Sequence, residues 1–237
     1  MMRSLAELAD AFFRLGAGED AEPREVVAEA APAPPAPVSA PPAPPAPPPT
    51  VPAAMVFDTE TTGLKDPLAV QIAWCIYNAG GYELSARAEY LALPPGRKID
   101  PNAQKVHHIS AKTLAEKGMA AQFVLTEFFE AFDRVAAAGG KLVVHNAQFD
   151  ARVVTNTARS CGLARDLRAA DCFCTMEHSK RRLNLTNRRG GLKPPKNIEL
   201  HEHLLGPVRD ELELHDALND VRVTAASFFA GGERGWW

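Results

Sequence analysis

The chain has 237 residues, of which 26 are lysine or arginine and 29 are aspartate or glutamate, so its formal net charge is −3. This balance argues against a protein that binds nucleic acid through overall charge, and a polyanionic ligand would need a local basic patch or metal ions. No run of about 18 apolar residues is present, which argues against a membrane span. Four cysteines without zinc-site or disulfide spacing favour reduced thiols and a cytoplasmic location.

The N-terminal part of the chain is expected to lie outside the globular domain. Residues 1–16 carry apolar side chains at helical spacing, from Leu5 to Leu15, and predict a short amphipathic helix. Residues 17–53 are acidic at first and then rich in proline and alanine, which predicts a disordered, extended linker. A helix this short is marginal alone in water, so we expect it to dock either on the domain or on a protein partner.

The globular domain is expected over residues 54–232. Short apolar runs between turn residues predict strands, and longer segments with apolar side chains three or four residues apart predict helices. We expect strands at 54–57, 69–77, 83–93 and 141–144, and helices at 121–138, 147–161, 175–182, 198–205 and 217–229. Three strands in series, followed by alternating helices and strands, are typical of a mixed α/β sheet.

Asp58 and Glu60 come where the first of these strands ends. Side chains two residues apart on a strand share a face and lie about 7 Å apart along it. Two carboxylates at the mouth of a buried strand repel each other and lose solvation, which a divalent cation between them would offset. Carboxylate oxygens suit Mg²⁺ and Mn²⁺. An Asp-x-Glu triplet is also common in surface turns, so this pair needs further acids before it indicates a metal site.

Two further aspartates are expected in the first turns of helices. Asn146 can cap the helix that follows the fourth strand, which places Asp150 in its first turn. Asp216 can cap the last helix and places Asp220 there, where the helix dipole favours a negative charge. His215 and Asp220 would diverge on one continuous helix, so they meet at one site only if His215 lies just outside it. A histidine in that position can accept a proton from water.

In chain order, three segments resemble the motifs of the DEDDh (DnaQ-like) 3′→5′ exonuclease family, which includes the proofreading epsilon subunit of bacterial DNA polymerase III. Residues 57–64 resemble the first motif, 145–150 the second, and 215–220 the third, a His-x-Ala-x-x-Asp pattern. Residues 106–109 are similar to a family segment in which glycine usually takes the place of His108. The resemblance covers nearly all of the expected domain, but neither the N-terminal helix nor the linker.

This resemblance implies a ribonuclease H-like fold, a mixed sheet of about five strands with helices on both faces. It also implies four acids that hold two divalent ions, Mg²⁺ or Mn²⁺, and a histidine that takes the proton of the attacking water. Two ions can stabilise both the attacking and the leaving oxygen. In this sequence the acids are Asp58, Glu60, Asp150 and Asp220, and the histidine is His215. The expected reaction removes nucleoside 5′-monophosphates from the 3′ end of single-stranded DNA, in proofreading or repair.

Six residues are expected to bind the substrate. The resemblance places Thr61 and Leu64 against the terminal nucleotide, and a leucine that closes the core is the alternative for Leu64. Residues 178–198, the basic segment, hold seven basic side chains and no acidic one, which predicts a loop that follows the phosphates of the incoming strand. A merely solvated loop is the alternative. The expected substrate-binding residues are Thr59, Thr61, Leu64, Asn146, Arg188 and Arg189.

Three other functions compete with a free DNA exonuclease. An exoribonuclease of the same family is one, because the 2′-hydroxyl is read by details of pocket shape that the sequence does not give. A proofreading subunit within a polymerase is the second, with residues 1–16 as the docking peptide. The third is a nucleic-acid-binding module without activity, which predicts the loss of an acid or of the histidine; the sequence retains all five residues.

Overall fold

The computed structural model describes residues 50–207 and 216–237. The predicted helix of residues 1–16, nearly all of the predicted linker and His215 therefore lie outside the described residues. Within the described ranges, no helix combines the length and the apolar character that a membrane span requires. The four cysteines are free thiols, as expected.

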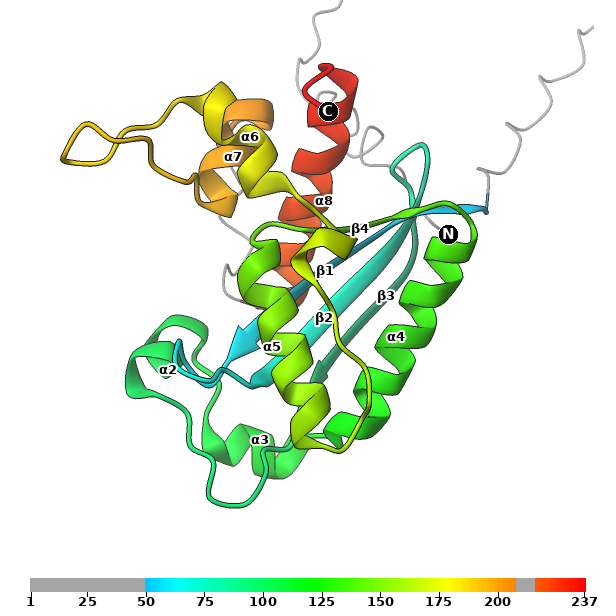
Figure 1. Cartoon of the computed structure of the whole chain (residues 1–237), viewed down its shortest axis with the longest axis vertical. Helices are drawn as coiled ribbons and strands as arrows, with labels where there is room; N and C mark the ends of the chain where they lie inside the picture. The colour runs from blue at the N-terminus through cyan, green and yellow to red at the C-terminus, as the bar shows by residue number, and fades with distance from the viewer. Residues whose placement is uncertain (1–49, 208–215) are drawn as a thin grey trace, which may run out of the picture. The chain divides into compact units, whose positions relative to one another are not determined.

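Five strands form one mixed sheet in the order β3-β2-β1-β4-β5 (Figure 1). β1 lies at the centre, antiparallel to β2 and parallel to β4, and the outer pairs are antiparallel β2–β3 and parallel β4–β5. The strands are β1 (Pro52–Thr61), β2 (Ala69–Asn78), β3 (Glu83–Tyr90), β4 (Lys141–Val144) and β5 (Cys172–Cys174). The predicted ribonuclease H-like architecture of about five strands is confirmed.

Seven α-helices and one short 3-10 helix accompany this sheet in the described residues. They are α2 (Pro101–His107), α3 (Ala111–Lys117), α4 (Ala121–Ala137), α5 (Ala147–Ser160), η1 (Ala169–Asp171), α6 (Thr175–Leu183), α7 (Asn197–Leu205) and α8 (Ala217–Glu233). The five longer helices that the sequence predicts are all present, and α8 runs four residues further than expected, to Glu233.

Alternation along β1 assigns each face of the sheet to a different set of helices. Met55 and Phe57 point toward α4 and α5, where the Phe57 ring meets Phe128 of α4 edge-on at 5.3 Å between centroids. Ala54 and Val56 point the other way and pack against α8. Figure 1 shows this arrangement, with α4 and α5 in front of the strands and α8 behind them. Helices on both faces explain why the central strand is apolar at every position up to Phe57.

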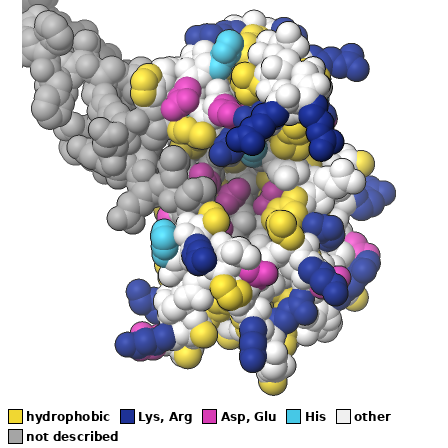
Figure 2. Space-filling view, turned by 90° about the vertical axis from the view of Figure 1, so that its left-hand side faces the viewer, with side chains coloured by type: hydrophobic (Ala, Val, Ile, Leu, Met, Phe, Trp, Pro, Cys, Tyr) yellow, Lys and Arg dark blue, Asp and Glu magenta, His cyan; other side chains and the backbone are white. Residues whose placement is uncertain are grey.

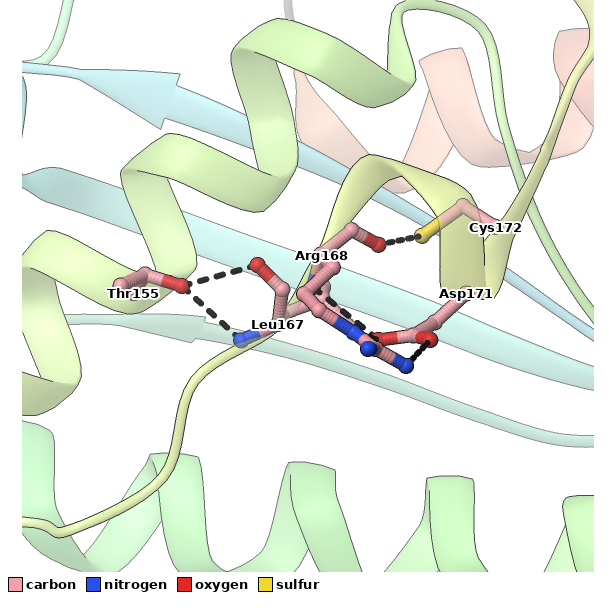
Figure 3. A network of polar contacts seen from close by, with 5 residues as sticks. All are labelled: Thr155, Leu167, Arg168, Asp171 and Cys172. Atoms are coloured by element: carbon pink, nitrogen blue, oxygen red, sulfur yellow. Dashed lines mark hydrogen bonds and ion pairs between the residues drawn. The ribbon is translucent and has the colours of Figure 1, made fainter.

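The sequence did not predict α2, α3 or β5. The two helices have seven residues each, too short for a clear helical period, and β5 has three. Side-chain hydrogen bonds fix the segment that leads into β5 (Figure 3): the Thr155 hydroxyl accepts from the Leu167 amide at 2.9 Å and donates to the Leu167 carbonyl at 3.0 Å. The Arg168 guanidinium pairs with Asp171 just before the strand begins. Polar contacts of this kind leave no apolar pattern in the sequence.

Candidate active site

Three of the predicted acids come together at the end of β1. The strand continues to Thr61, so Asp58 and Glu60 lie within it and extend the α8-facing row of side chains. Asp220 lies in the first turn of α8, as predicted. One carboxylate oxygen from each of the three lies within 4.8 Å of the other two. In the part of the chain that the structure describes, this is the one group of acids, histidines or cysteines spaced to hold a metal ion.

The fourth acid, Asp150, approaches from the opposite face of the sheet. It lies in the first turn of α5, as predicted, and is only 4% exposed. Thr59 points toward α5 because it alternates with Asp58 and Glu60, and its hydroxyl donates a 2.7 Å hydrogen bond to Asp150 Oδ1. The Thr59 side chain is itself buried, so it holds the Asp150 carboxylate in place. A contact between Thr59 and the substrate stays a prediction.

Crowding and burial make full ionisation of these acids unfavourable. Burial raises the pKa of Asp58 well above its ordinary value, and the charges of Asp150, Asp220 and Glu60 raise it further. Burial, followed by the charge of Asp220, raises the pKa of Glu60 to about 8. Burial raises the pKa of Asp150 to about 7, although the hydrogen bond from Thr59 lowers it. Crowded carboxylates of this kind, one buried and three half-buried, supply the oxygen ligands that one or two hard divalent cations prefer.

Of the two predicted helix caps, one is confirmed and the other is not. Asp216 occupies the N-cap of α8, and its Oδ1 accepts from the Leu218 amide at 3.1 Å, so that cap is confirmed. Asn146 occupies the N-cap position of α5, but its side chain makes no capping hydrogen bond, so that part of the prediction is wrong. Asn146 is instead partly exposed, and its backbone carbonyl accepts from the Asp150 amide at 3.1 Å. Its predicted contact with the substrate stays a prediction.

The turn after Glu60 presents an apolar side chain to solvent. The Thr61 hydroxyl lies 3.2 Å from the Gly63 carbonyl, to which it donates, and so closes a tight turn. Gly63 has a φ of 141°, and a Cβ there would come within 3.0 Å of Asp100. Leu64 is 80% exposed directly after this turn. A leucine exposed to this degree does not close the core, so the alternative interpretation of Leu64 is wrong.

Residues at the two ends of helix α2 are hydrogen-bonded to this turn, which the sequence did not predict. His107 is buried, and its Nδ1 accepts from the Ile109 amide at 3.0 Å. The other nitrogen, Nε2, therefore carries the proton and donates to the Thr61 carbonyl at 3.1 Å. The Asp100 amide donates to the next carbonyl, of Thr62, at 2.7 Å. Two adjacent backbone carbonyls are thus fixed where β1 ends.

A second unpredicted set of contacts joins the two helices that carry Asp150 and Asp220. His145 precedes α5, is buried, and bonds through Nε2 to the Pro195 carbonyl at 3.0 Å. Burial lowers the pKa of His145, although the hydrogen bond to the Pro195 carbonyl acts in the opposite direction. Two residues after Pro195, the Asn197 side chain donates to the Asp220 carbonyl at 3.1 Å. The end of the basic segment is thereby tied to both helices.

The tip of the basic segment, residues 187–191, makes no hydrogen bond to α5 or α8 within the described residues. Arg188 and Arg189 are exposed in a turn closed by the Asn187 amide, which donates to the Gly191 carbonyl at 2.8 Å. Within the described ranges neither guanidinium forms an ion pair, whereas Lys193 pairs with Glu199. Figure 2 shows acidic side chains on the floor of a hollow and lysine and arginine side chains gathered along one rim of it. The loop projects from the same side of the domain as the end of β1 (Figure 1).

Comparison with known proteins agrees with this geometry. The model of a family described as exonuclease (RNase T type) matches residues 55–228. The DNA polymerase III epsilon subunit of Haemophilus influenzae is 29% identical over 177 residues, which are 72% of this chain and 64% of that protein. The epsilon subunit of Pasteurella multocida is 35% identical over 101 residues, 40% of this chain and 38% of that one. The chain thus spans less than two thirds of the length of these curated relatives.

Solved structures of exonucleases share the fold. Escherichia coli exonuclease I in complex with a dT13 oligonucleotide superimposes with a TM-score of 0.62 at 16% identity, over 76% of this chain and 41% of that one. Cell-death related nuclease 4 superimposes with a TM-score of 0.59 at 14% identity, over 77% of this chain and 64% of that one. At these identities the likeness concerns the fold, and the chemistry depends on the residues described above.

Proposed function

This chain belongs to the exonuclease family, and we propose that it removes nucleoside 5′-monophosphates one at a time from the 3′ end of single-stranded DNA. The observation that carries the proposal is the meeting of Asp58, Glu60 and Asp220 within 4.8 Å, with Asp150 on the far side of the same strand. Four acids drawn from three elements at one end of the sheet require a positive partner. A phosphodiesterase that works with two metal ions needs such a cradle.

Asp58, Glu60, Asp150 and Asp220 would hold two divalent ions, Mg²⁺ or Mn²⁺. Such ions, when bound, activate water and stabilise the charge on the attacking and leaving oxygens. The chain's own residues supply the rest. Thr59 fixes the Asp150 carboxylate, Asp216 fixes the start of α8, and His215, next to that cap in the sequence, would accept the proton of the attacking water.

Two surfaces beside the acids would hold the DNA. Leu64, exposed on its closed turn, would press against the terminal base, while Thr61 keeps the turn in shape and lies against the same nucleotide. Arg188 and Arg189 would bind phosphates of nucleotides further from the 3′ end, because their guanidinium groups are exposed and unpaired within the described residues. Asn146, partly exposed beside Asp150, would complete the contacts to the strand.

We further infer a protein partner, a DNA polymerase whose newly made strand this exonuclease would proofread. The curated relatives are named as subunits of DNA polymerase III, and the segment of residues 1–16 predicts an amphipathic helix on a long tether. A truncated chain that begins at Ala53 should retain its activity on free DNA but lose capture of the polymerase. If the full chain and this truncated chain bind a replicative polymerase equally, the segment is not the docking peptide.

The activity is tested with oligonucleotides labelled at the 5′ end: single-stranded DNA, duplex DNA and RNA, each with Mg²⁺ or Mn²⁺. We expect a ladder of products that shortens from the 3′ end, fastest on single-stranded DNA and absent in Asp58→Ala. Glu116→Ala, which removes an exposed acid from α3, is the matched control and should leave the ladder unchanged. Faster degradation of RNA would identify an exoribonuclease, and no metal-dependent degradation of any strand would contradict the proposed activity.

A further inference from the structure

Gln71 is a buried polar residue beside the acids, although none of the sequence motifs includes it. It lies on β2 directly opposite Glu60 in the antiparallel pair with β1. Residues that face each other in such a pair point to the same side of the sheet, here the side of α8. The side chain is only 4% exposed. A buried amide of this kind needs hydrogen-bond partners for both of its ends.

Both ends of the Gln71 amide bind the start of α8. Nε2 donates to Asp216 Oδ2 at 3.1 Å, and Oε1 accepts from the Ala217 amide at 3.2 Å. Chemistry alone fixes this orientation, because a backbone amide only donates and an ionised carboxylate only accepts. Ala217 is the first residue of the helix, so its amide has no partner within α8. Gln71 supplies that partner.

These contacts reach Asp220 through one helical turn. The other oxygen of Asp216 caps the Leu218 amide at 3.1 Å, so both carboxylate oxygens of Asp216 are engaged in holding the helix start. The Asp216 carbonyl then accepts from the Asp220 amide at 3.0 Å. Gln71 therefore links Glu60 and Asp220. Its backbone lies opposite Glu60 in the β1–β2 pair, and its side chain is hydrogen-bonded to the first turn of α8, which carries Asp220.

We propose that Gln71 is a positioning residue of the metal centre: it sets where Asp220 stands relative to Glu60 and holds Asp216, the sequence neighbour of His215. This inference rests on the proposed function, since it assigns the same acids to metal binding. Gln71 itself contacts neither an ion nor the substrate. Its effect comes from the position of α8, so its loss should weaken metal binding and slow turnover while the binding of the DNA strand is unaffected.

Glutamine suits this position because one side chain must both donate and accept. Gln71→Met keeps the length and removes both hydrogen bonds. Gln71→Glu still accepts from Ala217 but places a second carboxylate against Asp216, which repels the helix start. Adding Asp216→Asn to Gln71→Glu restores every hydrogen bond, because the two side chains have then exchanged amide and carboxylate. The total charge of this double variant equals that of the original protein.

The test measures the binding of Mn²⁺ alone by calorimetry, together with kcat and KM on a single-stranded oligonucleotide. We expect Gln71→Met and Gln71→Glu to weaken Mn²⁺ binding about tenfold and to lower kcat, with KM unchanged. Gln71→Glu with Asp216→Asn should recover Mn²⁺ affinity to within about threefold of the original protein. Such a rescue shows that the amide–carboxylate pair, and not the bulk of the residue, supports the metal centre.

Thr155→Val is the matched control, because it also removes two side-chain hydrogen bonds, here those between the partly buried Thr155 and Leu167 (Figure 3). It should lower the unfolding temperature by as much as Gln71→Met does, without weakening Mn²⁺ binding. Equal Mn²⁺ affinity in the original protein and Gln71→Met, or no rescue by the paired exchange, would overturn the positioning role. If the original protein itself binds no Mn²⁺, the proposed function fails, whatever the variants do.

Discussion

The acids at the end of β1 and the tip of the basic segment lie on the same side of the domain but are built in opposite ways. Around the acids, long-range hydrogen bonds fix buried side chains: Thr59 bonds to Asp150, and Gln71 bonds to Asp216. Arg188 and Arg189 are exposed and have no ion-pair partner in the described ranges. The difference fits the roles that we propose, in which the acids would perform the chemistry and the tip of the basic segment would hold the strand.

If these roles are correct, substitutions at the acids should change kcat and metal binding, and substitutions in the basic segment should change KM and its dependence on salt. The largest effect is expected for Asp58→Ala, since Asp58 is surrounded by the other three acids. We expect kcat to fall by about a thousandfold or more, equivalent to about 4 kcal/mol. Single-turnover measurements with saturating Mn²⁺ separate this loss from weaker binding of the strand. A similar loss in Glu116→Ala would show that any acid of the surface contributes.

The next largest effect is expected for His215→Ala. Loss of a general base lowers turnover by about a hundredfold or more. The four acids remain, so calorimetry should find Mn²⁺ affinity unchanged. His203→Ala, which removes an exposed histidine from α7, is the control and should retain full turnover. Unchanged turnover in His215→Ala would remove this histidine from the mechanism and leave the water to be deprotonated by another group.

Without bound metal, the repulsion among the acids should make the stability of the folded chain depend on pH. The folded pKa values of Glu60 and Asp150 are raised, to about 8 and about 7. The folded chain therefore holds protons that the unfolded chain releases above about pH 4. Their contribution to stability is complete below about pH 4, decreases as pH rises above that value, and is lost by about pH 7 to 8. In EDTA the unfolding temperature should fall across this range.

Saturating Mn²⁺ should abolish most of that fall, because the cations replace the protons between the carboxylates. Asp58→Asn should also reduce the fall in EDTA, since it removes an acid whose own pKa is raised by burial and by the charges of Asp150 and Asp220. A profile that is flat in EDTA for the original protein, or that rises with pH, would contradict the shared burial of these acids. Unfolding is followed by circular dichroism at several pH values with and without the metal.

A smaller effect, of a different kind, is expected in the basic segment. Arg188→Ala with Arg189→Ala should raise KM for a long single strand by about tenfold at low salt and leave kcat unchanged. Two lost phosphate contacts should lower the slope of log affinity against log salt by about 1.4. Arg134→Ala with Lys117→Ala removes the same charge from exposed residues of α4 and α3 and serves as the control. Equal changes in both double variants would mean that only total charge matters.

The sequence predicted which acids meet at the end of β1 better than it predicted the contacts that hold them there. Asp58 and Glu60 were visible because strand alternation gives them one face. Asp150 and Asp220 were visible because Asn146 and Asp216 mark the helix starts, although only Asp216 makes a capping hydrogen bond. These signals are local, within about six residues. Likewise the central sheet and the longer helices follow from apolar periodicity, which is why α4, α5 and α8 were expected.

Long-range polar contacts leave no such signal. Gln71 and Asp216 are 145 residues apart, and His145 and Pro195 are 50 apart. A single glutamine or histidine is compatible with any exposed or buried position, so only the folded chain shows which carbonyl or carboxylate it meets. The same limit hid β5: the strand has only three residues, and the segment that leads into it is fixed by hydrogen bonds between Thr155 and Leu167 (Figure 3).

The smallest effect is expected for Leu64→Ala. Leu64 combines features of the acids and of the basic segment, because it follows the closed turn after Glu60 but faces solvent. Because the side chain is 80% exposed, its truncation should change the free energy of unfolding by less than about 0.5 kcal/mol. Lost apolar contact with the terminal base should raise KM about threefold, equivalent to about 0.7 kcal/mol. Leu205→Ala, at an exposed leucine of α7, should change neither quantity. Destabilisation by about 2 kcal/mol or more with KM unchanged would instead be the behaviour of a core leucine, and would assign Leu64 to the fixed centre alone.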